Sequence, residues 1–250
     1  MSTGKTVDVE IERPRLIRTK FKSYRTTEWM NNVRLNNVFL ALTDMDMTYP
    51  TSYDMVIADL KRLMGEPPSS FDSWTCVSVN TDHSSGSGYH YNHVTYGIDP
   101  DGVPRASFLE PLGNTSISEH LATELKKVIP SAETVHYSVG CQRNGSSCGY
   151  YSGWWQLHCQ GLVVNGCAPL EWTNPPKPPD GWERVCCRLF TIFDMQAEIP
   201  SALAKDIGLR PLFTKAVSSG VFNEGAFFTV IDEYASKLQD VIELAAAIRA

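Results

Sequence analysis

The sequence predicts an α+β protein in which helices flank a central, mostly antiparallel sheet. Two stretches near the N-terminus repeat apolar residues at helical spacing, and the middle of the chain changes to short strand-like runs bounded by turn residues. The last quarter returns to a helical pattern. Of the 250 residues, 42% are hydrophobic and 20% are charged, so the chain can bury a core of its own and disorder is not expected.

Several helical regions follow from the apolar spacing. They run from Thr27 into the early 40s, from Pro50 to Gly65, over 116–128, from near Cys148, and through 183–250. Thr26 and Thr27 can cap the first of them, and Gly65 with the prolines after it ends the second.

Strands are expected between these helices, where β-branched and aromatic residues gather. They cover 74–80, 93–98, 105–109 and 133–139. The sequence Asp-Pro-Asp-Gly at 99–102 predicts a tight turn, since proline presets φ and glycine accepts a positive φ. In an antiparallel hairpin around this turn, His93 and Glu110 lie at neighbouring strand ends, and we expect their side chains to meet.

The composition predicts four segments along the chain. They are an N-terminal arm over 1–22, a core over 23–164, a proline-rich linker or loop over 165–182, and a helical C-terminal part over 183–250 that packs on the core.

Charge and cysteine usage exclude several classes of function. The net charge of −6 argues against nucleic acid as the main partner, since phosphate binding needs clustered Lys and Arg. The seven cysteines are odd in number and irregularly spaced, which favours reduced thiols in a cytosol and gives no metal-site spacing. No apolar run is long enough for a transmembrane segment, and the N-terminus has no signal-peptide core. Nothing in the sequence calls for an oligomer.

The segment 142–149, Gln-Arg-Asn-Gly-Ser-Ser-Cys-Gly, carries the strongest chemical signal. A thiol that attacks an amide must ionise, and the N-terminus of a helix favours the thiolate. The helix predicted to begin near Cys148 supplies that environment. Gly149 leaves room for a substrate backbone, while the Cys148 N–H and the Gln142 side chain are the expected donors to an oxyanion.

A general base and an orienting acid come from the predicted hairpin. His93 begins a strand and Glu110 ends its partner, so we expect His93 to take the Cys148 proton and Glu110 to hold the His93 ring. His90 is the alternative base, but its spacing to Glu110 is twenty residues, and on a strand that runs from Tyr91 we expect its side chain to lie off the hairpin register. Asn92 is expected to assist the site.

The order His, Glu, Gln, Cys-Gly resembles the clan of cysteine peptidases that holds the SUMO proteases and the adenovirus protease. The resemblance covers roughly residues 25–162 and includes Phe-Leu-Glu-Pro-Leu-Gly at 108–113, which is similar to the strand end that bears the acid in the adenovirus protease. Glu-Trp-Met-Asn-Asn at 28–32 resembles the substrate-facing helix of the SUMO proteases. Val94 departs from the family, which usually has Trp directly after the catalytic His.

The resemblance implies a papain-like, adenain-like fold and a cysteine isopeptidase that acts after the C-terminal tail of ubiquitin or a ubiquitin-like protein. It implies a triad of His93, Glu110 and Cys148 with Gln142 at the oxyanion, and no cofactor or metal. The substrate-binding residues that we expect are Trp29, Asn31, Asn32, Asn92 and Gly149.

Two other reactions use the same triad. An effector acetyltransferase would pass an acetyl group from coenzyme A to a protein side chain, and a polyprotein-type endopeptidase would differ only in its substrate. The absence of a signal peptide predicts a cytoplasmic site of action, and a bacterial effector that is injected into a host cytosol is the context that we prefer.

Overall fold

A computed structural model describes residues 30, 32–43, 52–66, 74–80, 90–113, 115–138, 140, 142, 145–164, 177–197 and 207–249. The predicted N-terminal arm, 1–22, lies outside these residues. The chain divides into two compact units, and each is treated by itself. The described residues of Thr27–Leu40 and Asp44–Trp182 form the larger unit, and those of Ala41–Thr43 and Glu183–Ala250 form the smaller one.

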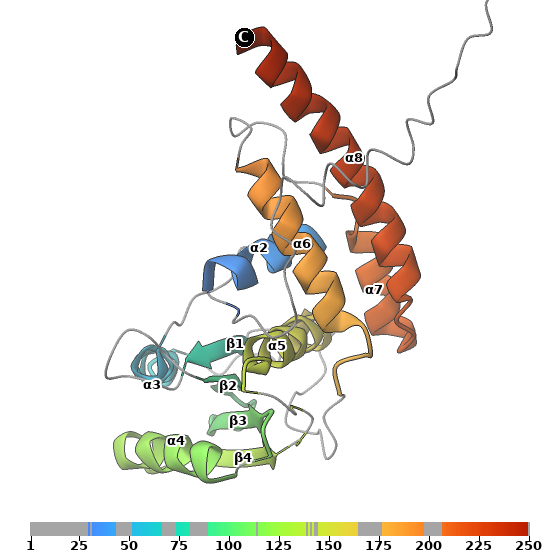
Figure 1. Ribbon diagram of the computed structural model, residues 1–250. Helices are drawn as coiled ribbons and strands as arrows, with labels where there is room; N and C mark the ends of the chain where they lie inside the picture. The colour runs from blue at the N-terminus through green and yellow to red at the C-terminus, as the bar shows by residue number, and fades with distance from the viewer. Residues whose placement is uncertain are drawn as a thin grey trace, which may run out of the picture. The chain divides into compact units, whose positions relative to one another are not determined.

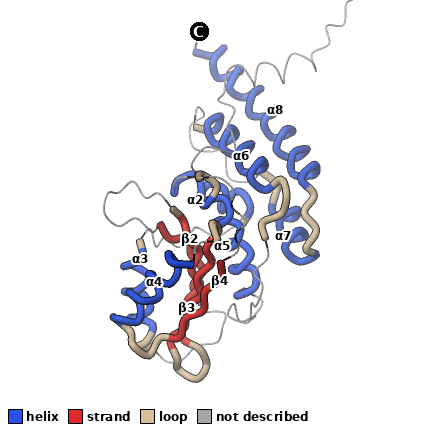
Figure 2. The backbone as a smooth tube through the Cα atoms, turned by 60° about the horizontal axis from the view of Figure 1, so that its bottom comes forward, coloured by secondary structure: helices blue, strands red, loops and turns tan. Residues whose placement is uncertain are grey.

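A four-stranded mixed sheet is the centre of the larger unit. Its strands are β1 (Thr75–Asn80), β2 (Tyr91–Ile98), β3 (Pro104–Glu110) and β4 (Glu133–Ser138), and they stand in chain order across the sheet. Strand β2 is antiparallel to both of its neighbours, β1 and β3, and β4 runs parallel to β3. The strands are drawn in red in Figure 2. The predicted α+β class with a mostly antiparallel sheet is therefore confirmed.

Helices cover both faces of this sheet (Figure 1). Helices α3 (Tyr53–Leu63) and α4 (Thr115–Val128) pack on one face, and α5 (Cys148–Val164) packs on the other face against β1 and β2. Successive strand residues point to opposite faces, so alternate residues of β1, β2 and β3 enter the core under α3 and α4. That core contains Tyr53, Val56, Leu60, Val77, Val79, Val94, Tyr96, Phe108, Leu121 and Leu125.

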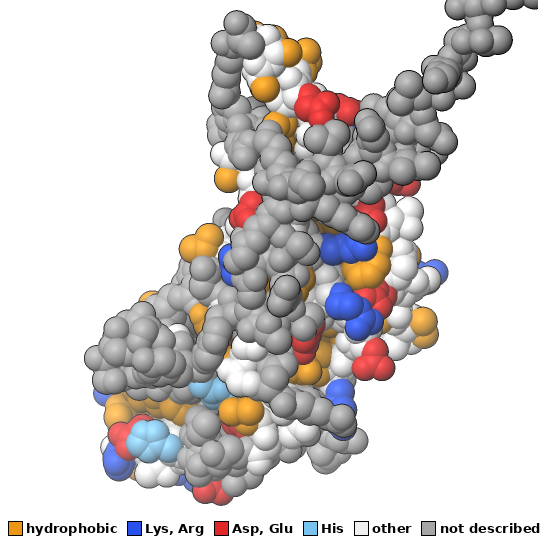
Figure 3. Space-filling model, in the orientation of Figure 1, with side chains coloured by type: hydrophobic (Ala, Val, Ile, Leu, Met, Phe, Trp, Pro, Cys, Tyr) orange, Lys and Arg blue, Asp and Glu red, His pale blue; other side chains and the backbone are white. Residues whose placement is uncertain are grey.

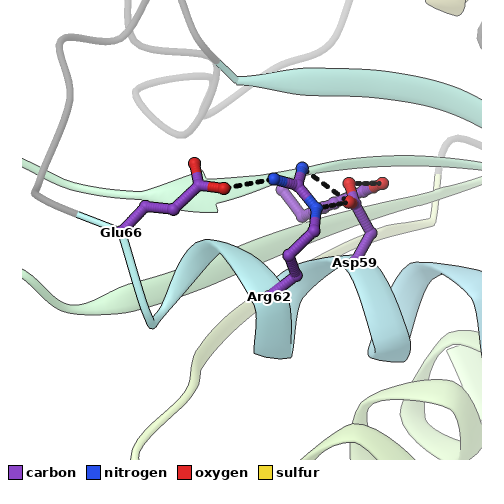
Figure 4. A network of polar contacts seen from close by, with 4 residues as sticks. Asp59, Arg62 and Glu66 are labelled. Carbon is purple, nitrogen blue, oxygen red and sulfur yellow. Dashed lines mark hydrogen bonds and ion pairs between the residues drawn. The ribbon is translucent and has the colours of Figure 1, made fainter.

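The outer side of α3 carries a small polar network (Figure 4). Arg62 lies between Asp59 and Glu66, with 2.9 Å between its Nε and an Asp59 carboxylate oxygen. The second oxygen of Asp59 accepts the hydroxyl of Tyr96 at 2.9 Å, which ties the helix to β2. Exposed ion pairs of this kind contribute little to stability, so the apolar side of α3 holds the helix in place.

The turn between β2 and β3 sets the register of the hairpin. Gly102 has a φ of +79°, as the Asp-Pro-Asp-Gly sequence predicts. An Asp99 carboxylate oxygen accepts the backbone N–H groups of Asp101 and Val103 at 2.9 and 2.8 Å. This turn pairs Ile98 with Pro104, and every later pair of the ladder follows from it.

Two element boundaries differ from the sequence expectation. Helix α2 spans Asn32–Leu42 and does not begin at Thr27, because Met30 is described and is not helical. Strand β2 begins at Tyr91, two residues earlier than expected. The second shift matters for the site, since it places the residues before His93 within reach of the end of β3.

The smaller unit contains α6 from its second residue onward (Trp182–Gln196), α7 (Arg210–Ser219) and α8 (Glu224–Arg249). Charged side chains join α6 to α8: Arg184 meets Glu224 at 2.6 Å, and Arg188 pairs with Asp232. On the visible face of this unit, basic and acidic side chains lie beside one another (Figure 3). Within the described ranges, no helix combines the length and the apolar character needed to cross a membrane.

Candidate active site

Cys148 is the first residue of α5, as the sequence predicts. The carbonyl of Ser147 accepts the N–H groups of Tyr150 and Tyr151 at 3.0 and 3.2 Å, so the helix starts directly after Ser147. The N–H groups of the first helical turn have no acceptor within their own helix, and the helix dipole adds a partial positive charge there. The Cys148 sulfur therefore lies where a negative charge is stabilised, although its side chain is only 1% exposed.

His90 is the histidine that meets the predicted acid. Its Nε2 lies 2.7 Å from Oε1 of Glu110, and the Glu110 side chain is completely buried. The same carboxylate oxygen accepts the N–H of Leu112 at 2.9 Å, which holds the carboxylate in position. The His90 ring also makes a side-chain hydrogen bond with Cys148. The structure thus joins Cys148, His90 and Glu110 in one connected group.

The surroundings of His90 favour its protonated form. Burial by itself lowers the pKa of an imidazole, but the hydrogen bonds to Cys148 and Glu110 and the negative charges of both groups outweigh it and raise the pKa of His90 to about 9. At neutral pH the ring is then an imidazolium that lies between the Cys148 sulfur and the Glu110 carboxylate.

His93 does not take part in this group, and the expectation that it faces Glu110 is wrong. The register pairs His93 with Leu109, so the next residue, Glu110, points to the opposite face of the sheet. His93 is completely buried, and its Nε2 lies 2.9 Å from the hydroxyl of Thr95. Burial, followed by the charge of His158, lowers the pKa of His93 to about 3, so this ring is neutral.

The sequence carried a signal for the correct histidine. If the ladder is counted outward from the turn at 99–103, Leu109 falls opposite His93, and Glu110 falls opposite Asn92 by extension. His90 then shares the face of Glu110, because it lies two residues from Asn92. Neighbouring strand ends are not sufficient for a side-chain contact, because successive side chains of a strand point to opposite faces of the sheet.

Gln142 and Asn92 both lie at this end of the sheet. The backbone N–H of Gln142 donates to the Pro111 carbonyl at 2.9 Å, so the residue expected at the oxyanion is tied to the chain directly after Glu110. Asn92 is a β2 residue with no exposed surface. Both expected residues are therefore placed beside the strand ends that carry His90 and Glu110.

Gly149 is needed for packing within the chain. A Cβ at this position would lie 2.9 Å from the Cβ of Met30 and 3.5 Å from the Met30 carbonyl oxygen. The space that we had expected to admit a substrate backbone at Gly149 is thus filled by Met30. A similar close approach occurs one helical turn later, where a Cβ on Gly153 would lie 2.6 Å from the Leu35 side chain. Among the other expected substrate-binding residues, Trp29 and Asn31 lie outside the described residues, and of Asn32 only the backbone is described.

Tyr91 is a site residue that the sequence did not indicate. Its ring lies 3.5 Å from the position that a Gly149 Cβ would occupy, against the first turn of α5. Burial, and then the negative charge of Cys148, raise the pKa of Tyr91 to about 12, so the phenol keeps its proton at neutral pH. The strand predicted over 93–98 does not include Tyr91, whereas β2 begins at this residue.

A second polar cluster lies under α5, where the structure places His93. The Thr95 hydroxyl donates to the Cys76 sulfur at 3.7 Å, and Cys76 hydrogen-bonds to Cys159. Burial, and then the bond to Cys76, raise the pKa of Cys159 far above its ordinary value, which makes it a poor nucleophile. Within the described part of the chain, no group of three or more His, Cys, Asp or Glu side chains could hold a metal ion.

The sequence was compared with protein-family models and with curated proteins. No model of a protein family matches the sequence, and no curated protein matches it. The geometry of the site is therefore the basis for the functional proposal.

Proposed function

We propose that this protein is a cysteine hydrolase that cleaves peptide or isopeptide bonds through a thioester on Cys148. The observation that carries the proposal is the connected group in which His90 contacts both the Cys148 sulfur and, at 2.7 Å, the Glu110 carboxylate. A thiol at a helix N-terminus, an imidazole beside it and a buried carboxylate that orients the imidazole are the parts that nucleophilic catalysis by cysteine requires.

The reaction follows from these contacts. Glu110 holds the His90 ring in its protonated form, and Cys148 reacts as the thiolate beside this imidazolium. The thiolate attacks the carbonyl carbon, and the N–H of Cys148 with the side chain of Gln142 stabilises the oxyanion. His90 then gives its proton to the leaving amine as the C–N bond breaks. Water, with His90 again as the base, hydrolyses the thioester and restores the thiol.

The tail of ubiquitin or a ubiquitin-like protein is the substrate that we favour. The order His, Glu, Gln, Cys-Gly is retained when His90 replaces His93 in the triad, although the spacing of the His to the Glu becomes twenty residues. The low exposure of Cys148, 1%, supports a slender substrate segment, since a bulky chain could not approach the sulfur. An endopeptidase acting on polyproteins would share each step and differ in the sequence before the cleaved bond.

Acetyl transfer is the competing reaction for the same triad. Enzymes of that kind use a pocket rich in Lys and Arg for an inositol phosphate. The two arginines near the start of α6 already form ion pairs with acidic side chains of α8. Arg184 and Arg188 are paired with Glu224 and Asp232. We therefore rank hydrolysis first.

Covalent capture tests the proposal. Ubiquitin, SUMO and NEDD8 probes that carry a thiol-reactive group at the C-terminus are incubated with the wild type, Cys148→Ala and Cys159→Ala. We expect an adduct with one probe in the wild type and in Cys159→Ala, whose cysteine lies on the same helix but away from His90, and no adduct in Cys148→Ala. An adduct that persists in Cys148→Ala would refute the proposed nucleophile. Labelling of Cys148 by iodoacetamide without capture by any probe would refute the substrate class and favour acetyl transfer.

A further inference from the structure

The two edge strands of the sheet, β1 and β4, have different surroundings. At the β1 edge, the Gln156 side chain of α5 accepts the Ser78 N–H at 2.8 Å, and Ser52 forms a bridge with Asn80. Strand β4 is the other edge, and within the described residues its backbone makes no hydrogen bond beyond the ladder with β3. In a strand that pairs on one side only, every second residue turns its N–H and C=O groups outward. The β4 edge can therefore accept another strand.

Strand β4 lacks the features by which edge strands usually avoid pairing. Proteins protect such strands with proline, lysine, bulges or a covering segment. The sequence of β4, Glu-Thr-Val-His-Tyr-Ser, contains neither proline nor lysine, and its register with β3 has no bulge. Glu133 is exposed, and Thr134, Val135 and His136 are half-buried, so this strand is in contact with solvent.

Helix α4 carries a row of exposed side chains along the same edge. Figure 1 shows α4 next to β4, on which it packs. Glu119, Thr123 and Lys126 follow one another at helical spacing, and all three are exposed. The charges of Glu119 and Lys126 both act on His136 of β4, so the row lies on the β4 side of the helix. Neither charge forms an ion pair with a residue that the structure describes.

This edge is complementary to a second copy of itself. When two β4 strands pair antiparallel about a twofold axis at Val135, Glu133 of each copy stands opposite an uncharged residue and far from the other Glu133. The same axis reverses α4, so Glu119 of each copy faces Lys126 of the other, and the two Thr123 residues meet at the middle. We propose that β4 and α4 form the interface of a homodimer in which the two sheets join into one.

The spacing of the elements lets the strands and the helices meet at the same time. Helix α4 packs on both β3 and β4, so its axis lies over the space between them. Adjacent strands are about 4.8 Å apart, so the two helices beside a β4–β4 pair stand about 10 Å apart, the distance of packed helices. The small Thr123 side chain permits this approach at the axis. The dimer goes beyond the proposed function, because none of these contacts involves Cys148.

Exchange of the charges across the twofold axis tests the inference. Sedimentation velocity from about 1 to 500 µM measures the dimer dissociation constants of the wild type, Glu119→Lys, Lys126→Glu and the double variant. Each single variant places like charges together at two symmetric contacts, and we expect its dissociation constant to rise about tenfold. The double variant restores opposite charges and should return to within about twofold of the wild type. An equimolar mixture of the two single variants should form a heterodimer as tight as the wild-type dimer.

Glu124→Lys is the matched control, since it makes the same change of charge on the other side of α4. Glu124 pairs with Lys127, and its charge acts on Tyr53 of α3, away from β4. We expect this variant to dimerise like the wild type. Hydrogen exchange tests the strand contact separately, because the amides of β4 should exchange more slowly as the protein concentration rises through the dissociation constant.

Three results would overturn the inference. A wild type that stays monomeric up to about 500 µM would show that a second copy does not occupy this edge, and an extended segment of another protein would then be the occupant to seek. A dimer that all the charge variants leave unchanged would place the interface elsewhere. Single variants that weaken the dimer without recovery in the double variant or in the mixture would exclude the twofold contact between Glu119 and Lys126.

Discussion

Replacing His90 and His93 one at a time should separate catalysis from folding. His90→Ala removes the imidazole that contacts Cys148 and Glu110, and we expect kcat to fall about 10²- to 10⁴-fold, the usual contribution of a general base. His93→Gln changes a buried neutral ring on the other face of the sheet. We expect it to retain the catalytic constants and to lose stability, by about 1–3 kcal/mol, because the bond to Thr95 is disturbed.

The pKa of His90 also predicts how the stability of the protein depends on pH. Its pKa rises from 6.5 to about 9, a difference of 2.5 units, and at 1.36 kcal/mol per unit the folded state stabilises the protonated ring by about 3 kcal/mol. Because the pKa is higher in the folded than in the unfolded state, this stabilisation is complete below pH 6.5 and is lost as the pH rises through 9. The difference in unfolding free energy between the wild type and His90→Ala should shrink by about that amount over this interval.

Two assays measure these effects on the same proteins. The rate of iodoacetamide alkylation at Cys148 at neutral pH reports the reactivity of the thiol, and we expect His90→Ala to lower this rate because the imidazole beside the sulfur is gone. Urea unfolding at pH 6 and at pH 9.5 measures the difference in unfolding free energy between the wild type and His90→Ala at each pH.

The opposite outcome would refute the assignment of the base. If His93→Gln abolished alkylation at neutral pH while His90→Ala preserved it, His93 would be the base, and the register that separates it from Glu110 would be incorrect. Equal losses in both variants would indicate that the polar clusters on the two faces act as one unit.

Three further predictions concern packing and pH. Gly97→Ala would bring a Cβ to within 2.7–2.9 Å of the Trp74 ring, so we expect a loss of about 1–3 kcal/mol in urea unfolding, whereas Gly145→Ala, where a Cβ meets nothing within 4 Å, should be neutral. Trp182→Phe deletes the buried 2.7 Å hydrogen bond from its indole N–H to the Tyr150 carbonyl of α5, and we expect the free energy of unfolding to fall by about 1–3 kcal/mol. An unchanged urea midpoint would show that this hydrogen bond does not stabilise the fold. Because the pKa of His93 is lower in the folded than in the unfolded state, acid should destabilise the protein, by about 2 kcal/mol between pH 6.5 and 4.5, and His93→Gln should be less sensitive.

Local sequence signals were sufficient for most elements of the fold. The Asp-Pro-Asp-Gly turn, the strand at 75–80 and the helix that begins at Cys148 follow from residue preferences over a few positions, and the structure has them where they were expected. The early start of β2 at Tyr91 could not be read in the same way. It depends on pairing with β1, where Asn80 lies opposite Tyr91.

The sequence by itself therefore determined the α+β class, the position of Cys148 at a helix start, and the position of Glu110 at a strand end, because each depends on periodicity, turn chemistry or residue type within a short segment. Only the tertiary structure decided which histidine meets that acid and what lies over Gly149. A shift of one residue in a strand sends a side chain to the other face of the sheet, so His90 and His93, three positions apart, have opposite environments. The contact of Met30 with Gly149 joins segments more than a hundred residues apart, and no local pattern specifies such a contact.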